Sequence, residues 1–204
     1  MGEERGAPDR LVFQGTADQL EAAGDDVHLL RALLDRRTNR ACGAVFALIF
    51  GLGAVAALWQ QDPRGILCLA ALAAVGVVLW RRDTGREAVR DARSSRRARE
   101  RYQAKGKYDG TIPVRIELIQ GECRIWCQEA QPREVIDCRR FRSAVESEEI
   151  LWIAGRRMPG LVLPKGLLVQ GTEEELRIWL DPYVRKWKTL EIPKTWKEKM
   201  DIGR

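Results

Sequence analysis

Two long runs without a single charged residue dominate the sequence. The first covers 19 residues from Ala41 to Trp59, and the second covers 16 residues from Gly65 to Trp80. At ~1.5 Å of helical rise per residue, they extend about 28 Å and 24 Å, close to the ~30 Å hydrocarbon core of a bilayer. A soluble core helix of this length normally carries a polar stripe, which neither run has. We therefore expect two transmembrane helices (41–59 and 65–80) rather than a buried pair.

The link between the two runs, residues 60–64, is so short that it predicts an antiparallel hairpin. Lys and Arg accumulate on the cytoplasmic side of a membrane, so they set the orientation. The link contains only Arg64, whereas residues 81–107 contain 11 basic residues against 4 acidic ones. The protein is therefore expected to be multi-pass in the plasma membrane, with both termini cytoplasmic.

Small residues recur every four positions in the first run, at Gly43, Ala47 and Gly51 and again at Gly53 and Ala57. This spacing lets two helices approach closely in lipid. The alternative is that glycine and alanine are simply common in membrane helices, and the sequence leaves both interpretations open.

The flanks of the hairpin are expected to be cytoplasmic. Residues 1–40 predict a short strand (RLVFQG) and then a helix, which begins at a capping box of Thr16 and Gln19. Residues 81–107 predict a basic juxtamembrane helix that either docks on anionic lipid or serves only as a charged spacer. Its candidate lipid-headgroup contacts are Arg93, Arg96, Arg97 and Arg99.

Residues 108–188 change to short β-like runs with turns every ~8–12 residues, which predicts an antiparallel sheet or small barrel that folds alone. Thr172 and Glu175 form a second capping box, which starts a helix over the sheet that Pro182 should kink or end. Residues 189–204 show no period and predict a flexible tail. The expected fold is an α+β membrane protein, a two-helix transmembrane hairpin with a cytoplasmic antiparallel sheet or barrel capped by a C-terminal helix.

The search for chemistry finds no catalytic motif, phosphate loop or paired carboxylates. Cys123 and Cys127 share a strand face and could join Cys138 at a metal. A structural zinc site usually needs four ligands, so packing as small hydrophobic residues is favoured. Lys165, in the turn-like LPKG, is a candidate headgroup contact together with the nearby Arg156 and Arg157, the alternative being a solvated side chain. We predict no catalytic, cofactor-binding or metal residues, and expect no enzyme activity.

The order of the motifs resembles the YcxB-like family of membrane proteins. The resemblance covers about residues 10–187 and includes RLVFQGTADQL, the two apolar runs, IELIQGECRIWCQE, EVIDCRRFRSAVESEEILWIA, VLPKGLL and GTEEELRIWL. It implies a domain similar to the pleckstrin-homology fold, a curved antiparallel barrel closed by a C-terminal helix. It brings no established catalytic residues, and Pro182 departs from a regular closing helix.

These features predict a non-catalytic, membrane-anchored interaction module that binds a protein partner or lipid at the inner membrane face. Homo-oligomerisation stays open. Nucleic acid is not expected as a partner, because Tyr102 alone could stack on bases within the basic stretch. The alternative is a component of a small transport or channel complex, although neither apolar run has the ionisable residues that mark a pathway.

Overall fold

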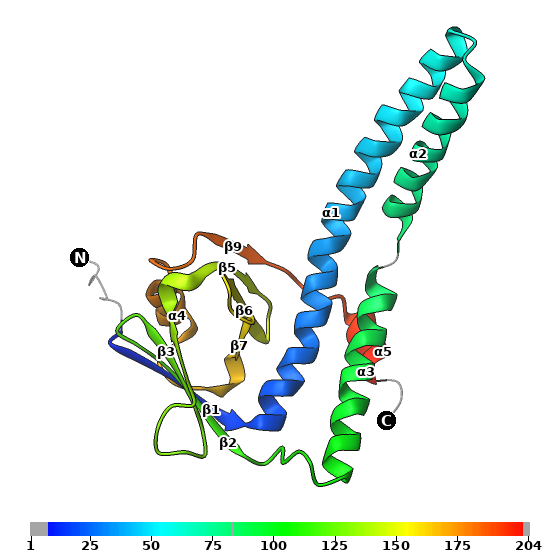
Figure 1. Cartoon of the computed structure of the whole chain (residues 1–204). Helices are drawn as coiled ribbons and strands as arrows, with labels where there is room; N and C mark the ends of the chain where they lie inside the picture. The colour runs from blue at the N-terminus through cyan, green and yellow to red at the C-terminus, as the bar shows by residue number, and fades with distance from the viewer. Residues whose placement is uncertain (1–7, 83, 202–204) are drawn as a thin grey trace. The chain divides into compact units, whose positions relative to one another are not determined.

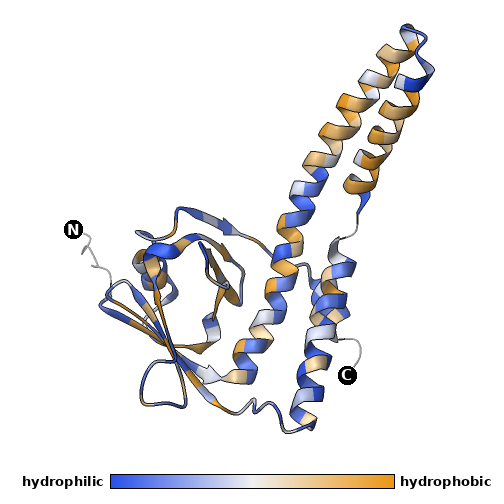
Figure 2. Cartoon of the chain, viewed as in Figure 1, coloured by the Kyte–Doolittle hydropathy of each residue, from blue (hydrophilic) through white to orange (hydrophobic). Residues whose placement is uncertain are grey.

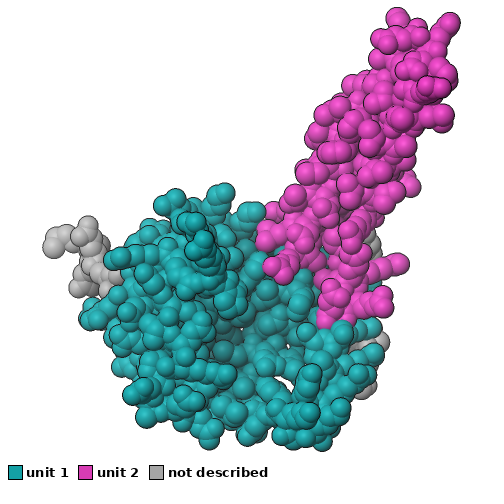
Figure 3. Space-filling view, viewed as in Figure 1, with its two compact units in different colours: residues 1–30, 92–204 teal, residues 31–91 magenta. Residues whose placement is uncertain are grey.

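The computed structural model describes residues 8–82 and 84–201 (Figure 1). The chain forms two compact units, shown in different colours in Figure 3. Unit 1 combines Met1–Leu30 with Ala92–Arg204, and unit 2 consists of Arg31–Asp91. Unit 1 is therefore assembled from segments on both sides of the apolar hairpin.

The hairpin is built from α1 (Ala17–Trp59) and α2 (Pro63–Arg81). The α2 helix begins sharply, because the Asp62 side chain accepts a hydrogen bond from the Arg64 amide and Pro63 occupies the first turn. Both helices are long and apolar enough to cross a membrane. Figure 2 shows α2 and the part of α1 beside it mainly in orange, whereas the N-terminal part of α1 is mixed with blue. The expected pair of long apolar helices is thus confirmed, and Gly24 does not interrupt α1.

The two helices approach each other closely at three small residues. A Cβ atom added to Gly43 would lie 2.6 Å from the carbonyl oxygen of Gly76, and one added to Gly76 would lie 2.6 Å from the amide nitrogen of Ala47. By contrast, nothing lies within 4 Å of a Cβ atom added to Gly51. Gly43 and Ala47 therefore serve close packing, whereas Gly51 does not.

The basic segment after the hairpin forms α3 (Thr84–Ala104), as the sequence predicted. Within unit 2, the Thr84 hydroxyl donates a hydrogen bond of 3.1 Å to the carbonyl oxygen of Ala32. This buried bond ties the start of α3 to α1.

Unit 1 contains two sheets with an apolar core between them. The strands of the first sheet are, in spatial order, β4 (Glu134–Asp137), β3 (Glu122–Cys127), β2 (Pro113–Ile119), β1 (Arg10–Thr16) and β8 (Leu168–Gln170). Those of the second are β7 (Leu161–Pro164), β6 (Ile150–Gly155), β5 (Phe141–Glu146) and β9 (Lys186–Thr189). The short 3-10 helices η1 (Cys138–Arg140) and η2 (Lys165–Leu167) connect strands of the two sheets.

The antiparallel expectation is confirmed for every strand pair except β5–β9, which is parallel. The barrel expectation is wrong, because the strands form two separate sheets that do not close on each other. The parallel pair arises because the chain crosses over through α4 (Glu173–Leu180) before β9 begins.

The N-terminal strand β1 lies inside the first sheet, between β2 and β8. It pairs with β2 over seven residues, from Arg10 opposite Ile119 to Thr16 opposite Pro113. Residues 108–188 alone therefore lack an interior strand, and the β-rich fold extends beyond the range that the sequence pattern suggested.

The core collects alternate residues from both sheets, such as Phe13, Ile116 and Ile153, which are at most 2% exposed. On its edge lies α4, which contributes Trp179 and Leu180 and begins at the capping box of Thr172. The α4 helix ends at Leu180, in agreement with the prediction that Pro182 would kink or end it.

The tail expectation is wrong in part, because Lys194–Asp201 forms α5 and Trp196 is buried. A short amphipathic turn after a proline gives too weak a period to be seen in the sequence. Residues 202–204 of the predicted tail lie outside the described residues.

Candidate functional site

The arginines predicted to contact lipid do not form one surface. The Arg99 guanidinium pairs with the Asp25 carboxylate of α1 and lies 3.7 Å from the nearest carboxylate oxygen of Glu21. Its side chain is only 17% exposed. Arg99 therefore joins α3 to α1 within unit 1 rather than facing lipid.

The other three arginines of this group differ in their surroundings. The Arg96 guanidinium lies 3.8 Å from the Glu100 carboxylate one turn later, and Arg93 donates a hydrogen bond to the carbonyl oxygen of Lys199 on α5. Arg97 is exposed, and within the described part of the chain it makes no ion pair. Of the four predicted contacts, Arg97 is thus the one fully turned to solvent.

Lys165 lies at the centre of a partly buried ion cluster. Its Nζ atom is 2.7 Å from a carboxylate oxygen of Glu146 and 2.7 Å from one of Glu173. Glu146, whose side chain is 4% exposed, also accepts a hydrogen bond of 2.6 Å from Arg177 on α4. Lys165 is therefore neither solvated nor turned toward a headgroup, and it joins η2 to β5 and α4.

The ionisation of this cluster follows from competing effects. Burial alone lowers the pKa of Lys165, but hydrogen bonds to Glu146 and Glu173 outweigh it and raise the pKa. Burial raises the pKa of Glu146, but its bonds from Lys165 and Arg177 bring the pKa below the usual value. The cluster is therefore fully charged at neutral pH, and its charges compensate one another.

Two cavities lie between the α1 and α3 segments of unit 1, and the Asp25–Arg99 pair lines both. The larger, about 420 Å³, is lined by Asp18, Arg96 and Glu100 among others, and Met200 of α5 covers part of it. The smaller, about 330 Å³, is lined by Leu20, His28 and Ser95 among others. Acidic and basic groups are mixed in both cavities, and in each the carboxylates outnumber the arginines by one, so neither presents an excess of positive charge to a ligand.

A second acidic residue of α1, Asp26, is 9% exposed. Burial raises its pKa to about 6, and although Lys197 of α5 lowers it, the neighbouring Glu149 carboxylate raises it further. The Lys197 ammonium lies 2.5 Å from Glu149. Asp26, Glu149 and Lys197 therefore connect α1, the turn between β5 and β6, and α5, and we assign them a structural role.

The cysteines of the β-rich part behave as core residues. Cys123 and Cys138 are fully buried in the apolar cluster, and Cys127 packs against it. Burial raises the pKa of both buried thiols, for Cys138 to about 12. Within residues 8–82 and 84–201, no three His, Cys, Asp or Glu side chains are grouped as a metal site would require.

A cationic surface lies at the start of β5, and of its residues the sequence pattern indicated only Arg156 and Arg157. Three segments meet there, residues 138–142, 155–158 and 184–188, and together they carry eight basic residues and no acidic one. We call them the β5 basic patch, which consists of Arg139, Arg140, Arg142, Arg156, Arg157, Arg185, Lys186 and Lys188. The antiparallel β5–β6 pairing joins the first two segments, with Phe141 opposite Gly155. The third joins them only through the parallel β5–β9 pairing, which no local pattern predicts.

Comparison of the chain with protein families, curated proteins and solved structures finds no match. The candidate site therefore rests on the geometry of the chain itself. The described residues offer two kinds of feature for binding: the cavities between α1 and α3, in which acidic and basic groups are mixed, and the uncompensated charge of the β5 basic patch.

Proposed function

We propose that the chain is a non-catalytic, membrane-anchored interaction module, in which the hairpin holds unit 1 at the cytoplasmic face of the membrane. One observation carries the proposal: the apolar side chains of the hairpin face outward. Leu48, Leu52 and Leu67 leave 63%, 64% and 72% of their surface exposed. Soluble proteins rarely leave so continuous an apolar surface in water, whereas lipid solvates it.

The β-sheet supports the proposed topology. β1 precedes the hairpin and β2 follows it, yet they pair along seven residues of one sheet. Two strands of one sheet lie on the same side of a membrane, so the segment between them must cross it an even number of times. Two crossings, at 41–59 and 65–80, satisfy this requirement. The excess of Lys and Arg outside the 60–64 link favours a cytoplasmic location for both flanks.

A transport or channel component receives no comparable support. Residues 41–59 and 65–80 contain no Asp, Glu, Lys, Arg or His that could mark an ion or proton pathway. Membership of the YcxB-like family remains a prediction, which agrees with a module of this kind.

Cysteine labelling in intact cells tests the anchor and its topology. In a background with Cys42, Cys68 and Cys127 replaced by alanine, Gln61→Cys should react with a membrane-impermeant maleimide added outside. Lys105→Cys, an exposed position after α3, should react only after the cells are permeabilised. Labelling of Lys105→Cys in intact cells, or recovery of the protein in the soluble fraction, contradicts the proposal.

A further inference from the structure

We infer that the β5 basic patch binds anionic phospholipid headgroups of the membrane that holds the hairpin. This inference rests on the proposed function and names the ligand of the module. It moves the lipid-binding role from Arg99 and Lys165, which are held in ion pairs, to a surface of which the sequence pattern suggested only Arg156 and Arg157.

Backbone hydrogen bonds fix the patch in place. The Arg156 amide donates to the Arg140 carbonyl oxygen at 2.9 Å, and the Arg185 amide donates to the Arg142 carbonyl oxygen at 3.1 Å. The Arg140 guanidinium also donates to the Arg157 carbonyl oxygen. The cations therefore project from a rigid frame rather than from a flexible tail.

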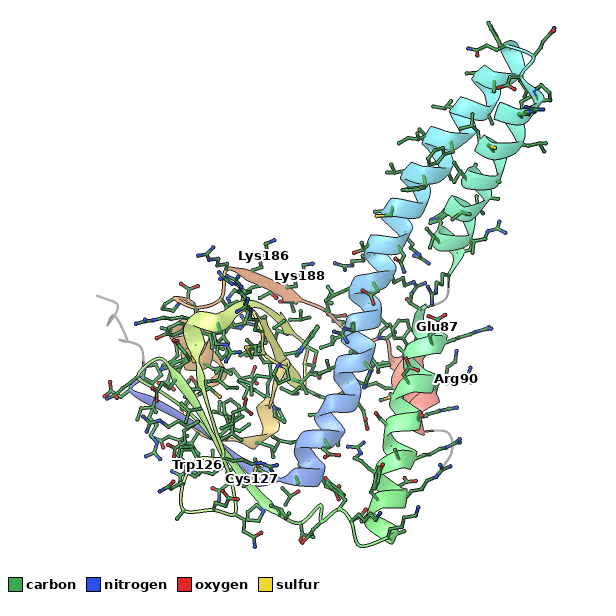
Figure 4. The ribbon with its side chains drawn as sticks, in the orientation of Figure 1. Glu87, Arg90, Trp126, Cys127, Lys186 and Lys188 are labelled. Carbon is green, nitrogen blue, oxygen red and sulfur yellow. The ribbon has the colours of Figure 1, made fainter. Side chains whose placement is uncertain are left out.

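The charge of the patch is available to a ligand. All eight side chains belong to exposed residues. Within residues 8–82 and 84–201, none of the eight forms an ion pair, in contrast to Arg99 and Lys165. Lys186 and Lys188 stand on the edge strand β9 on either side of Trp187, which packs against the core, so both lysines face outward (Figure 4).

The chemistry of the patch fits phosphate esters. Arginine presents two parallel N–H donors to phosphate oxygens, and the patch contains six arginines. Nucleic acid fits less well, because sequence-tolerant binding of single strands also needs exposed aromatic faces. Trp187, the one aromatic residue between the two lysines of the patch, is turned into the core.

The hairpin holds unit 1 close to the membrane. Only residues 31–40 separate Leu30, the last residue of this part of unit 1, from the first apolar run at Ala41. Ten residues span at most ~36 Å even when fully extended. The patch thus meets lipid at the high effective concentration of a tethered site, so weak individual contacts suffice for docking.

The test uses the full chain in lipid nanodiscs, in the same cysteine-free surface background, with a donor dye on Thr189→Cys. The discs carry an acceptor dye on their headgroups. They consist of phosphatidylcholine alone or with about 30 mol% phosphatidylglycerol. We expect stronger energy transfer in the anionic discs, and a return to the neutral level at about 0.5 M NaCl, where screening is nearly complete.

Two matched variants separate the patch from general charge. Arg142→Gln/Lys186→Gln/Lys188→Gln removes three charges from the patch, and Arg101→Gln/Lys105→Gln/Lys107→Gln removes three exposed charges elsewhere in unit 1. A basic residue near an anionic surface contributes a factor of about five, so the patch variant should lose on the order of 100-fold in docking equilibrium. The second variant should keep most of the anionic effect.

Equal energy transfer in both disc types, or an equal loss in both variants, would overturn the inference. So would tighter binding of a short single-stranded RNA than of the anionic discs. The salt and lipid dependence of the unmodified patch decides the question even if the triple variant does not fold. Failure of the protein to co-elute with any discs would instead refute the proposed anchor.

Discussion

Adding one methyl group at Gly43 should weaken the hairpin, whereas the same change two turns later should not. An alanine Cβ at Gly43 would lie 2.6 Å from both the Gly76 carbonyl oxygen and the Trp80 amide nitrogen. Ordinary contact begins at 3.4 Å, so the helices must separate by 0.8 Å at this level. Overpacking of this kind costs about 1–3 kcal/mol. At Gly51 nothing lies within 4 Å, so alanine should gain about 0.5–1 kcal/mol from its helix propensity.

The assay follows separation of the helices directly. Donor and acceptor dyes on Arg40→Cys and Arg82→Cys, with the three accessible native cysteines replaced, report the distance between the helix ends during an SDS titration. We expect opposite signs for Gly43→Ala and Gly51→Ala. Gly43→Ala/Gly76→Ala should cost less than the sum of the single changes, because the first methyl group already separates the helices. Equal effects at positions 43 and 51 would refute close packing as the reason for the spacing.

Three further outcomes are expected. Lys165→Met leaves Glu146 buried with one cation fewer, so the free energy of unfolding by urea should fall by about 2–4 kcal/mol. A loss below about 1 kcal/mol would contradict the inference that the Lys165 ion pairs stabilise the fold. The pKa of Asp26 is raised to about 6 in the folded protein, so its contribution to stability is greatest below pH ~4 and is lost as pH rises to ~6. Asp26→Asn should therefore raise the free energy of unfolding by about 2–3 kcal/mol at pH 8 but not at pH 4. Thermal unfolding across this pH range would show the difference. Burial and raised pKa values should keep Cys123 and Cys138 unmodified by iodoacetamide at pH 8 until the chain unfolds, as mass spectrometry of the peptides would reveal.

The parts of the fold that were predictable from the sequence depend on local patterns. The apolar runs, the α3 helix, the capping box at Thr172 and the turn at Gly121 are each encoded within a few residues. Gln120 and Gly121 both have positive φ, as a two-residue hairpin loop requires. Local periodicity and capping chemistry thus specify these elements without reference to distant residues.

The parts that could not be predicted depend on pairing between distant segments. β9 shows no alternation that would identify it as a strand, and it forms through the parallel partner β5. Lys165 resembled a solvated turn residue because Glu146 and Glu173, which lie on other elements, cannot be assigned to it from spacing. The β5 basic patch was hidden for the same reason: its charges occur as short pairs and triplets that become one surface only after folding.

The position of the hairpin within the fold links membrane insertion to the folding of unit 1. Residues 17–112 separate β1 from β2, so the chain must close a long loop before these strands can pair. In the proposed topology both crossings must be complete before β1 and β2 meet on one side. A chain that crossed the membrane only once would leave β2 and β8 without the strand that lies between them. The backbone groups of β2 and β8 that face the missing strand would then have no partner, and the core beneath it would be open to solvent. In that topology the seven-residue β1–β2 ladder makes correct insertion a condition for a folded unit 1, and a misinserted chain cannot assemble the β5 basic patch on a stable frame.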